Sequence, residues 1–283
     1  MSKRMILTIL FGASLVMTCA QASDPVAGVT PHPDGFVPPS MDDIPDGAFG
    51  DSVRRGKLIF DHTRQSDARR FVGNQQSCNN CHLGSGRVAG SAPMWAAWVA
   101  YPAYREKNHH VNTMEERLRG CFTYSMNAQA SEAGEAPPPG HEVLKDLQSY
   151  MFWMAKGAPT GDARMPGRGY PQLDDPPQPY DPGRGAIVYA QSCAICHQAE
   201  GAGMTVEGQV LFPPLWGDGA YNAGAGMHRV NTAAAFIHAN MPLGLGGTLS
   251  VQEAWDVAAY INSKPRPKDP RDKAGSSTSA AAQ

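Results

Sequence analysis

The pentapeptides CNNCH at residues 78–82 and CAICH at residues 193–197 decide the fold of this 283-residue chain. Each has the spacing Cys-x-x-Cys-His, in which two cysteine sulfurs bond the vinyl groups of a c-type haem and the histidine binds the iron. One copy also suits a zinc site or a redox dithiol, but two copies within matching flanks favour two covalently bound haem c groups. The attachment residues are Cys78, Cys81, Cys193 and Cys196, with His82 and His197 as axial ligands.

The N-terminus has the pattern of an export signal. Lys3 and Arg4 precede an apolar run over 5–17, and Ala-Gln-Ala at 20–22 is a cleavage sequence. The run is shorter than a membrane-spanning helix requires, and no later segment is apolar enough to span a bilayer. Cys19 leaves a lipoprotein as the alternative. We therefore expect a signal peptide at 1–22 and a periplasmic protein without a transmembrane segment.

Charge and cysteine count narrow the possible partners. Removing the signal changes the formal charge from −2 to −4, and this mild acidity argues against nucleic acid as a partner. Of six cysteines, Cys19 leaves with the signal, four hold haem, and Cys121 remains alone. An exported protein with one unpaired cysteine is unusual because its compartment oxidises exposed thiols. Cys121 therefore needs a separate explanation.

The two halves of the chain repeat the same order of motifs. Each half has an Arg-Gly helix start, a haem motif, Pro-x-Trp, Val-Asn-Thr and a closing amphipathic helix. No segment indicates sheet. The sequence therefore predicts an all-α protein with two tandem class I cytochrome c-like domains, each folded around a covalent haem c. Besides the haem motifs, the repeated segments are 55–60, 93–95, 111–113 and 143–155 in the first half, and 184–189, 214–216, 230–232 and 251–261 in the second.

Composition sets the expected boundaries between these parts. The segment 157–183 carries seven prolines, too many for a helix, and is predicted to be a semi-rigid connector that fixes the geometry between the haems. The predicted parts are a signal peptide at 1–22, an extended arm at 23–46, a first domain at 47–156, a Pro/Gly-rich linker at 157–183, a second domain at 184–267 and a disordered tail at 268–283.

The repeat aligns an unpaired cysteine with a methionine. Met241 lies nine residues after Thr232, within Asn-Met-Pro, where small cytochromes c place the methionine that ligates iron. Cys121 lies eight residues after the matching Thr113. Cysteine is shorter than methionine, and Gly120 beside it permits a close approach of the backbone to haem. The repeat thus favours Cys121 as the second axial ligand of the first haem and Met241 as that of the second.

The alternative is that Cys121 is a small buried hydrophobic residue. The iron of the first haem would then be bound by Met126, Met114, His109 or His110. A thiolate ligand differs chemically from a methionine or histidine ligand. It stabilises Fe(III), and it leaves a sulfur nucleophile that is usable near neutral pH. A protein that only carries electrons needs neither property.

Basic residues gather in the same stretch of the chain. They form either a solvated helix face, paired with neighbouring glutamates, or a pocket for a small oxyanion whose oxygens bind guanidinium groups. The residues are Arg87, Arg105, Lys107, Arg117 and Arg119.

The segment RLRGCFTYSMN at 117–127, with the two haem motifs around it, resembles the dihaem thiosulfate dehydrogenases. The resemblance extends from about Ser52 to Pro267, and its most specific parts are Arg-x-x-x-Cys-Phe-x-x-Ser and NMPLG at 240–244. It implies that Cys121 is both an axial ligand and the site of sulfur chemistry. Arg117 and Ser125 are implied to line the thiosulfate site, and Arg105 is placed there less securely because the upstream spacing varies.

One residue departs from the pattern of some relatives in this family. They have a lysine directly before the ligating methionine and exchange the two ligands on reduction. Asn240 takes that place in this chain. This substitution argues against a lysine switch at the second haem.

The reaction implied by the resemblance joins two thiosulfates into tetrathionate and releases two electrons, one for each haem. The electrons would leave for a periplasmic cytochrome c or a similar high-potential acceptor. Two other classes of protein stay open: a non-enzymatic dihaem electron carrier, and a Sox-type thiosulfate-carrying cytochrome subunit. The direction of the reaction also stays open, since the same site can reduce tetrathionate.

Overall fold

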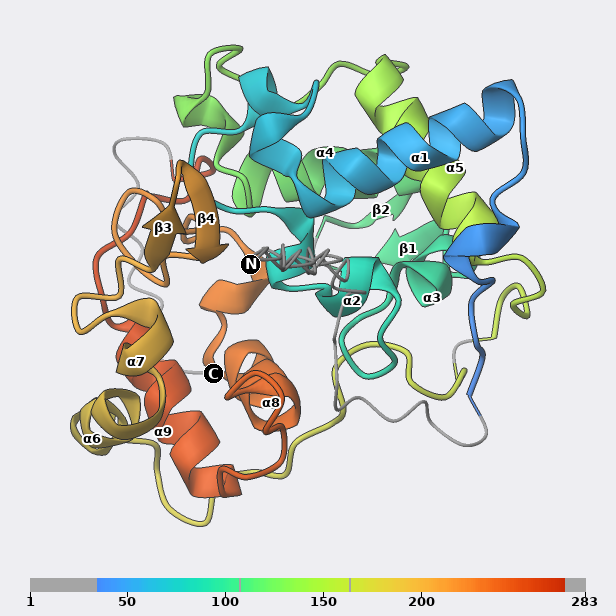
Figure 1. Cartoon of the computed structure of the whole chain (residues 1–283). Coiled ribbons are helices and arrows are strands. Elements are labelled where there is room, and N and C mark those ends of the chain that lie inside the picture. Colours follow the sequence, from blue (N-terminus) through green and yellow to red (C-terminus); the bar gives the residue numbers. More distant parts are fainter. Residues whose placement is uncertain (1–34, 107, 163, 273–283) are drawn as a thin grey trace, which may run out of the picture.

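The structure is a computed structural model that describes residues 35–106, 108–162 and 164–272. The predicted signal peptide at 1–22 lies outside the described residues, as do residues 23–34 of the arm and 273–283 of the tail. Helices dominate both halves of the chain (Figure 1). Among the described residues, no helix has both the length and the apolar character needed to cross a membrane.

The first half contains five α-helices and five short 3-10 helices in the described part of the chain. The closing helix predicted at 143–155 is present as α5. The elements are η1 (Met41–Asp43), α1 (Ala48–Asp61), η2 (Thr63–Gln65), η3 (Arg69–Phe71), η4 (Cys78–Asn80), α2 (Leu83–Gly86), α3 (Met94–Val99), α4 (Met114–Tyr124), η5 (Ala128–Ala130) and α5 (Glu142–Met154).

The second half repeats this plan in fewer residues. The closing helix predicted at 251–261 is present as α9. The elements are α6 (Pro182–Ser192), α7 (Ala194–His197), η6 (Gly226–His228), α8 (Val230–Asn240) and α9 (Val251–Asn262).

Each half also contains one short antiparallel hairpin, which the sequence did not indicate. In the first half, β1 (Ala103–Arg105) pairs with β2 (His110–Asn112). In the second half, β3 (Met204–Val206) pairs with β4 (Gln209–Phe212). Strands of three or four residues on the surface bury no face and show no alternating pattern. The all-α class with two cytochrome c domains is confirmed, with these hairpins as additions.

A glycine lets the first and last helices of each half cross closely (Figure 1). A Cβ atom on Gly56 of α1 would lie 2.0 Å from the backbone oxygen of Asp146 in α5. A Cβ atom on Gly185 of α6 would lie 2.0 Å from the backbone oxygen of Asp256 in α9. The Arg-Gly repeat read from the sequence therefore marks the point where the helices touch.

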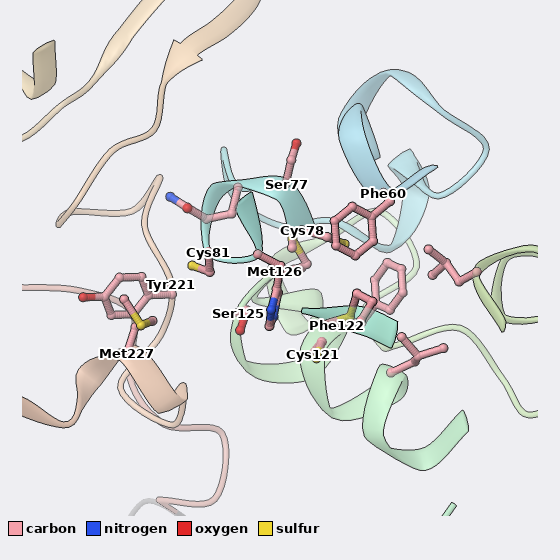
Figure 2. Close-up of a pocket in the computed structure, with 15 residues that line it drawn as sticks. Phe60, Ser77, Cys78, Cys81, Cys121, Phe122, Ser125, Met126, Tyr221 and Met227 are labelled. Atoms are coloured by element: carbon pink, nitrogen blue, oxygen red, sulfur yellow. The ribbon is translucent and has the colours of Figure 1, made fainter. Parts of the chain in front are cut away.

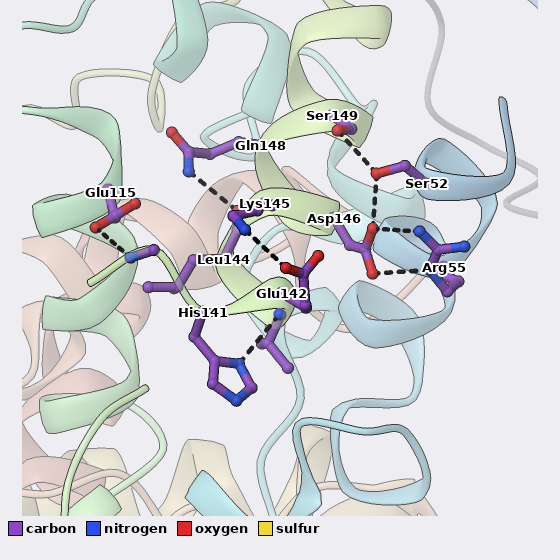
Figure 3. Close-up of polar contacts among 12 residues, drawn as sticks. Ser52, Arg55, Glu115, His141, Glu142, Leu144, Lys145, Asp146, Gln148 and Ser149 are labelled. Carbon is purple, nitrogen blue, oxygen red and sulfur yellow. Dashed lines mark hydrogen bonds and ion pairs between the residues drawn. The ribbon is translucent and has the colours of Figure 1, made fainter. Parts of the chain in front are cut away.

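The arginine of the same dipeptide binds a buried aspartate on the partner helix. Arg55 donates to both carboxylate oxygens of Asp146 at 2.9 Å, and Ser52 donates to the same group at 2.6 Å (Figure 3). Arg184 donates to Asp256 at 2.7 and 2.9 Å. The two aspartates are only 5% and 2% exposed, so each needs this charged partner.

Buried amide side chains join the two halves. Asn74 Nδ2 donates to the backbone oxygens of Ser125 and Ala220, at 2.7 and 3.0 Å. Gln76 Nε2 donates to the backbone oxygen of Pro214 at 2.8 Å. Asn222 Nδ2 donates to the backbone oxygen of Thr123 at 3.0 Å. These contacts fix the segment before the first haem motif, and the end of α4, against the part of the second half that contains Pro214, Ala220 and Asn222.

The segments outside the two domains also pack on them. In the linker, the hydroxyl of Tyr170 donates to the backbone oxygen of Cys81 at 3.0 Å, and its ring lies 5.3 Å from that of Phe236 in α8. At the start of the predicted tail, the guanidinium of Arg271 lies 4.9 Å from the centre of the Tyr124 ring in α4. The described part of the tail, through Asp272, therefore begins in contact with the first half.

Candidate active site between the two haem motifs

A pocket of about 620 Å³, including its open mouth, lies between η4 and α4 in the first half. In Figure 2, Cys78 and Cys81 lie on one side of this pocket and Cys121 lies on the other. The pocket is mostly apolar, because Phe60, Met94, Leu118, Phe122, Met126 and Leu147 also line it. The fold thus brings Cys121 to the same pocket as the first haem motif.

The histidine of each haem motif is held in the orientation that an axial ligand needs. His82 Nδ1 donates to the backbone oxygen of Ala92 at 2.7 Å, and burial lowers the pKa of His82 to about 4. His197 Nδ1 donates to the backbone oxygen of Pro213 at 2.9 Å, and burial lowers its pKa as well. A hydrogen bond at Nδ1 leaves Nε2 of a neutral ring available to bind a metal ion.

Helix α4 positions Cys121. The helix begins with a capping box, in which the Thr113 hydroxyl accepts from the Glu116 backbone and the Glu116 carboxylate accepts from the Thr113 backbone. Cys121 lies in the last full turn of this helix. Its charge adds to the raised pKa values of Cys78 and Cys81, for which burial is the main cause, so its sulfur lies within electrostatic range of both.

Arg117 and Ser125 flank Cys121 at four residues on either side. The Cys121 sulfur is the main cause of the raised pKa of Arg117, and Tyr101 and Tyr170 add to it. Residues four apart lie on one face of a helix. The Arg117 side chain therefore lies near the Cys121 sulfur and the rings of Tyr101 and Tyr170. Ser125 caps α4 and lines the pocket.

The other predicted basic residues have different surroundings. The side chain of Arg105 is exposed on β1, and among the described residues it is not one that lines either haem pocket. Arg119 donates to the backbone oxygen of Pro137 at 3.0 Å. Arg87 donates to the backbone oxygens of Pro38 and Pro39 and so holds the N-terminal arm. Lys107 lies outside the described residues.

The alternative ligands for the first haem differ in position. His109 and His110 are exposed on the hairpin between β1 and β2. Met114 is buried in the hydrophobic core of the first half. Of these four residues, Met126 lines the pocket, where it is 3% exposed. Met126 is therefore the alternative to Cys121 that the geometry retains.

The second pocket, of about 1290 Å³ with its open mouth, contains Cys193, Cys196, His197 and Met241. Met241 caps the end of α8, and its backbone N–H donates to Ile237. Asn240 is buried and donates to the backbone oxygen of Phe236 at 3.1 Å. Each pocket thus combines two attachment cysteines, a neutral histidine, apolar walls and a further sulfur, and this donor set fits a covalent haem c.

The two pockets adjoin. Gln76, Cys81, Tyr221 and Met227 line both of them, and Figure 2 shows Tyr221 and Met227 reaching from the second half toward Cys81. Sequence reasoning missed Gln76, Tyr221 and Met227 because none of them belongs to a motif or to the repeat. Their role follows only from the docking of the two halves.

Comparisons with known proteins match each half of the chain to a cytochrome c family. Residues 68–160 match the SoxA/TsdA cytochrome c domain, and residues 181–261 match the cytochrome c oxidase cbb3-type subunit III family. The chain is 49% identical to a thiosulfate dehydrogenase of Stutzerimonas stutzeri over 83% of this chain and 74% of the relative. It is 51% identical to one of Thiomonas intermedia over 83% of this chain and 73% of the relative.

A solved structure is also similar. It is the thiosulfate dehydrogenase TsdBA from Marichromatium purpuratum in its as-isolated form, with a TM-score of 0.83 and 58% sequence identity. The match covers 86% of this chain and 51% of that chain. This chain therefore spans about half the length of that structural relative.

Proposed function

Because the chain belongs to the thiosulfate dehydrogenase family of c-type cytochromes, we propose that it oxidises two thiosulfate ions to tetrathionate. The site is the pocket of the first haem motif, where His82 and Cys121 would hold the iron of the bound haem. His197 and Met241 would hold the second haem, which would supply the exit for electrons to an external acceptor. The observation that carries this proposal is the position of Cys121, which lines one pocket with the haem motif and lies beside Arg117.

Cys121 is the nucleophile in the proposed mechanism. Its thiolate bonds to the terminal sulfur of the first thiosulfate, and two electrons leave as this sulfur–sulfur bond forms. The terminal sulfur of the second thiosulfate then attacks the thiosulfate sulfur that is bonded to Cys121. The bond to Cys121 breaks, tetrathionate is released, and the thiolate is restored. When bound, the two haems accept the two electrons, one each.

Arg117 and Ser125 bind the substrate in this proposal. Two thiosulfate dianions repel each other, and the guanidinium near Cys121 offsets that repulsion through charge-assisted hydrogen bonds to the sulfonate oxygens. The Ser125 hydroxyl supplies a further donor on the pocket wall. Arg105 is a weaker candidate, since it is exposed on β1, whereas Arg117 interacts with the Cys121 sulfur.

The proposed route for electrons crosses the contact between the two pockets. Because four residues line both pockets, bound haems would lie close together, and the linker residue Tyr170 holds the first haem motif against α8. We place the domains at 47–156 and 184–267 with the linker at 157–183. The acceptor is a periplasmic cytochrome c or a similar high-potential protein, reached after export of the chain.

The test uses the purified dihaem protein with thiosulfate and an artificial one-electron acceptor. Tetrathionate formation and the electron paramagnetic resonance spectrum of the oxidised protein are measured together. We expect released tetrathionate and a low-spin thiolate signal, both lost in Cys121→Ala and kept in the matched control Met126→Leu. Full activity in Cys121→Ala would show that Cys121 is not the nucleophile. Thiosulfate that stays bound to protein without tetrathionate would instead indicate a carrier subunit.

A further inference from the structure

The end of helix α4, directly after Cys121, is held by hydrogen-bond donors from outside the helix. The last carbonyl groups of an α-helix have no partner within the helix itself. In α4, the backbone oxygens of Thr123 and Tyr124 both accept from one residue of the second half, Asn222. Its Nδ2 donates to Thr123 at 3.0 Å, and its backbone N–H donates to Tyr124 at 3.1 Å. The other half of the molecule therefore caps the helix that carries Cys121.

The next two carbonyl groups bind the segment before the first haem motif. Asn74 Nδ2 donates to the backbone oxygen of Ser125 at 2.7 Å. The backbone N–H of Gly73 donates to the backbone oxygen of Met126 at 2.8 Å. Asn74 also donates to the backbone oxygen of Ala220 in the second half, at 3.0 Å. Four consecutive carbonyl groups thus accept from two segments that are distant in sequence.

Burial makes these contacts costly to break. Asn222 is 0% exposed, and Asn74 and Asn127 are each 7% exposed. Asn222 Nδ2 also donates to Oδ1 of Asn127 at 3.1 Å, and its Oδ1 accepts from the backbone N–H of Gly224 at 3.0 Å. A buried carbonyl or amide that loses its partner costs free energy. The end of α4 is therefore fixed in position against both halves.

We propose that Asn222 is a positioning residue for the candidate active site, and that it sets the place of Cys121 and Ser125 through the end of α4. Cys121 precedes the capped carbonyls by about one turn, and both side chains line the pocket (Figure 2). Because a cysteine side chain is short, the distance from its sulfur to a bound iron depends on where the helix backbone lies. The second half thus completes the substrate site of the first half, in addition to its role as electron exit. This inference rests on the proposed role of Cys121 as an iron ligand.

The test measures how readily added imidazole displaces Cys121 from the iron of the first haem in the oxidised dihaem protein. Displacement is followed by the loss of the low-spin thiolate signal in electron paramagnetic resonance spectra. In Asn222→Ala, we expect the apparent affinity of the first haem for imidazole to rise about tenfold, the scale of one lost hydrogen bond to a buried group. Asn222→Ser keeps a small polar side chain, and it gives the same test if Asn222→Ala does not accumulate.

The matched control is Asn240→Ala. Asn240 is another buried amide of the second half, but it donates to the backbone oxygen of Phe236 within its own half, at 3.1 Å. Its substitution should leave the imidazole affinity of the first haem within about twofold of wild type, as expected for an independent site. A residue that only stabilises the second half would not change a ligand equilibrium at the first haem.

The outcomes separate this inference from the proposed function. An unchanged imidazole affinity in the Asn222 variants, or an equal rise in Asn240→Ala, would overturn the inference alone. A wild-type protein without the thiolate signal would overturn the proposed role of Cys121, and this inference with it. The titration involves no thiosulfate, so it does not depend on turnover.

Discussion

The first half presents a cysteine to its haem motif from inside helix α4, whereas the second half presents a methionine from the residue that follows α8. Cysteine has a short side chain, so the helix itself must approach the pocket. Methionine is longer by two heavy atoms and reaches its pocket from the chain beyond the helix. The two halves therefore bring a sulfur to the pocket of their haem motif with different backbones.

The scaffold around these sulfurs is the same in both halves. An arginine pairs with a buried aspartate, a glycine lets two helices cross, and a backbone oxygen accepts from the haem histidine. The proposed division into a substrate site and an electron exit would thus require few changes to one domain plan. The difference lies in the sulfur and in what surrounds it, because Cys121 has Arg117 beside it while Met241 follows a buried Asn240.

The largest effect is expected when the first half is given the sulfur of the second. Cys121→Met should lower thiosulfate oxidation by about a thousandfold or more, since removal of a nucleophile costs at least this much in other enzymes. The reduction potential of the first haem should rise toward that of the second. Turnover with an artificial acceptor and redox titration measure both effects. An active Cys121→Met protein would show that the sulfur difference is not what separates the halves.

Substitution of the crossing glycines should give the next largest effect. Gly56→Ala and Gly185→Ala each place a Cβ 2.0 Å from a backbone oxygen, so the helices must separate. We expect each variant to lose about 3 kcal/mol in the free energy of unfolding, typical of an overpacked core. Guanidinium denaturation followed by circular dichroism measures the loss. Gly226→Ala, whose Cβ has no atom within 4 Å among the described residues, is the control and should be neutral.

The buried aspartates should contribute somewhat less. Asp146→Asn and Asp256→Asn should each cost about 2 kcal/mol, the scale of a hydrogen bond to a charged group. Burial alone would raise the pKa of Asp256, but hydrogen bonds from Arg184, Asp181 and Gln252 outweigh it and lower the pKa below its ordinary 3.8.

The pH dependence of Asp256→Asn follows from this lowered pKa. The stabilisation by the carboxylate is fully present above pH 3.8 and is lost as pH falls through the lowered value. The difference in unfolding free energy between wild type and Asp256→Asn should therefore be constant near neutrality and shrink in acid. A difference that grows in acid would contradict the assignment.

The smallest effect is expected at the linker, which belongs to neither repeat. Tyr170→Phe removes the hydrogen bond to the backbone oxygen of Cys81 and should cost about 1 kcal/mol in the free energy of unfolding. Tyr180→Phe is the matched control, because Tyr180 is another linker tyrosine that stacks on Trp255 and is half exposed. Equal losses in the two variants would mean that the Tyr170 hydroxyl does not couple the halves.

The fold class was predictable because haem attachment uses a contiguous motif. The pentapeptide Cys-x-x-Cys-His identifies the cofactor as haem c. The repeated segments around the two pentapeptides predict two domains with the same fold. The closing helices could be predicted because their apolar period is long and regular. The hairpins could not be predicted, since three residues on the surface carry no period.

The sequence by itself determined the number of haems, the two attachment motifs and the unpaired cysteine, because each can be read from neighbouring residues of the chain. Only the tertiary structure decided which distant residues meet. The partners of Arg55 and Arg184 lie 91 and 72 residues away. Arg117 lies beside Cys121, whereas Arg87 and Arg119 bind backbone oxygens. Contacts of this kind depend on how helices and halves pack together, and packing leaves no pattern in neighbouring residues.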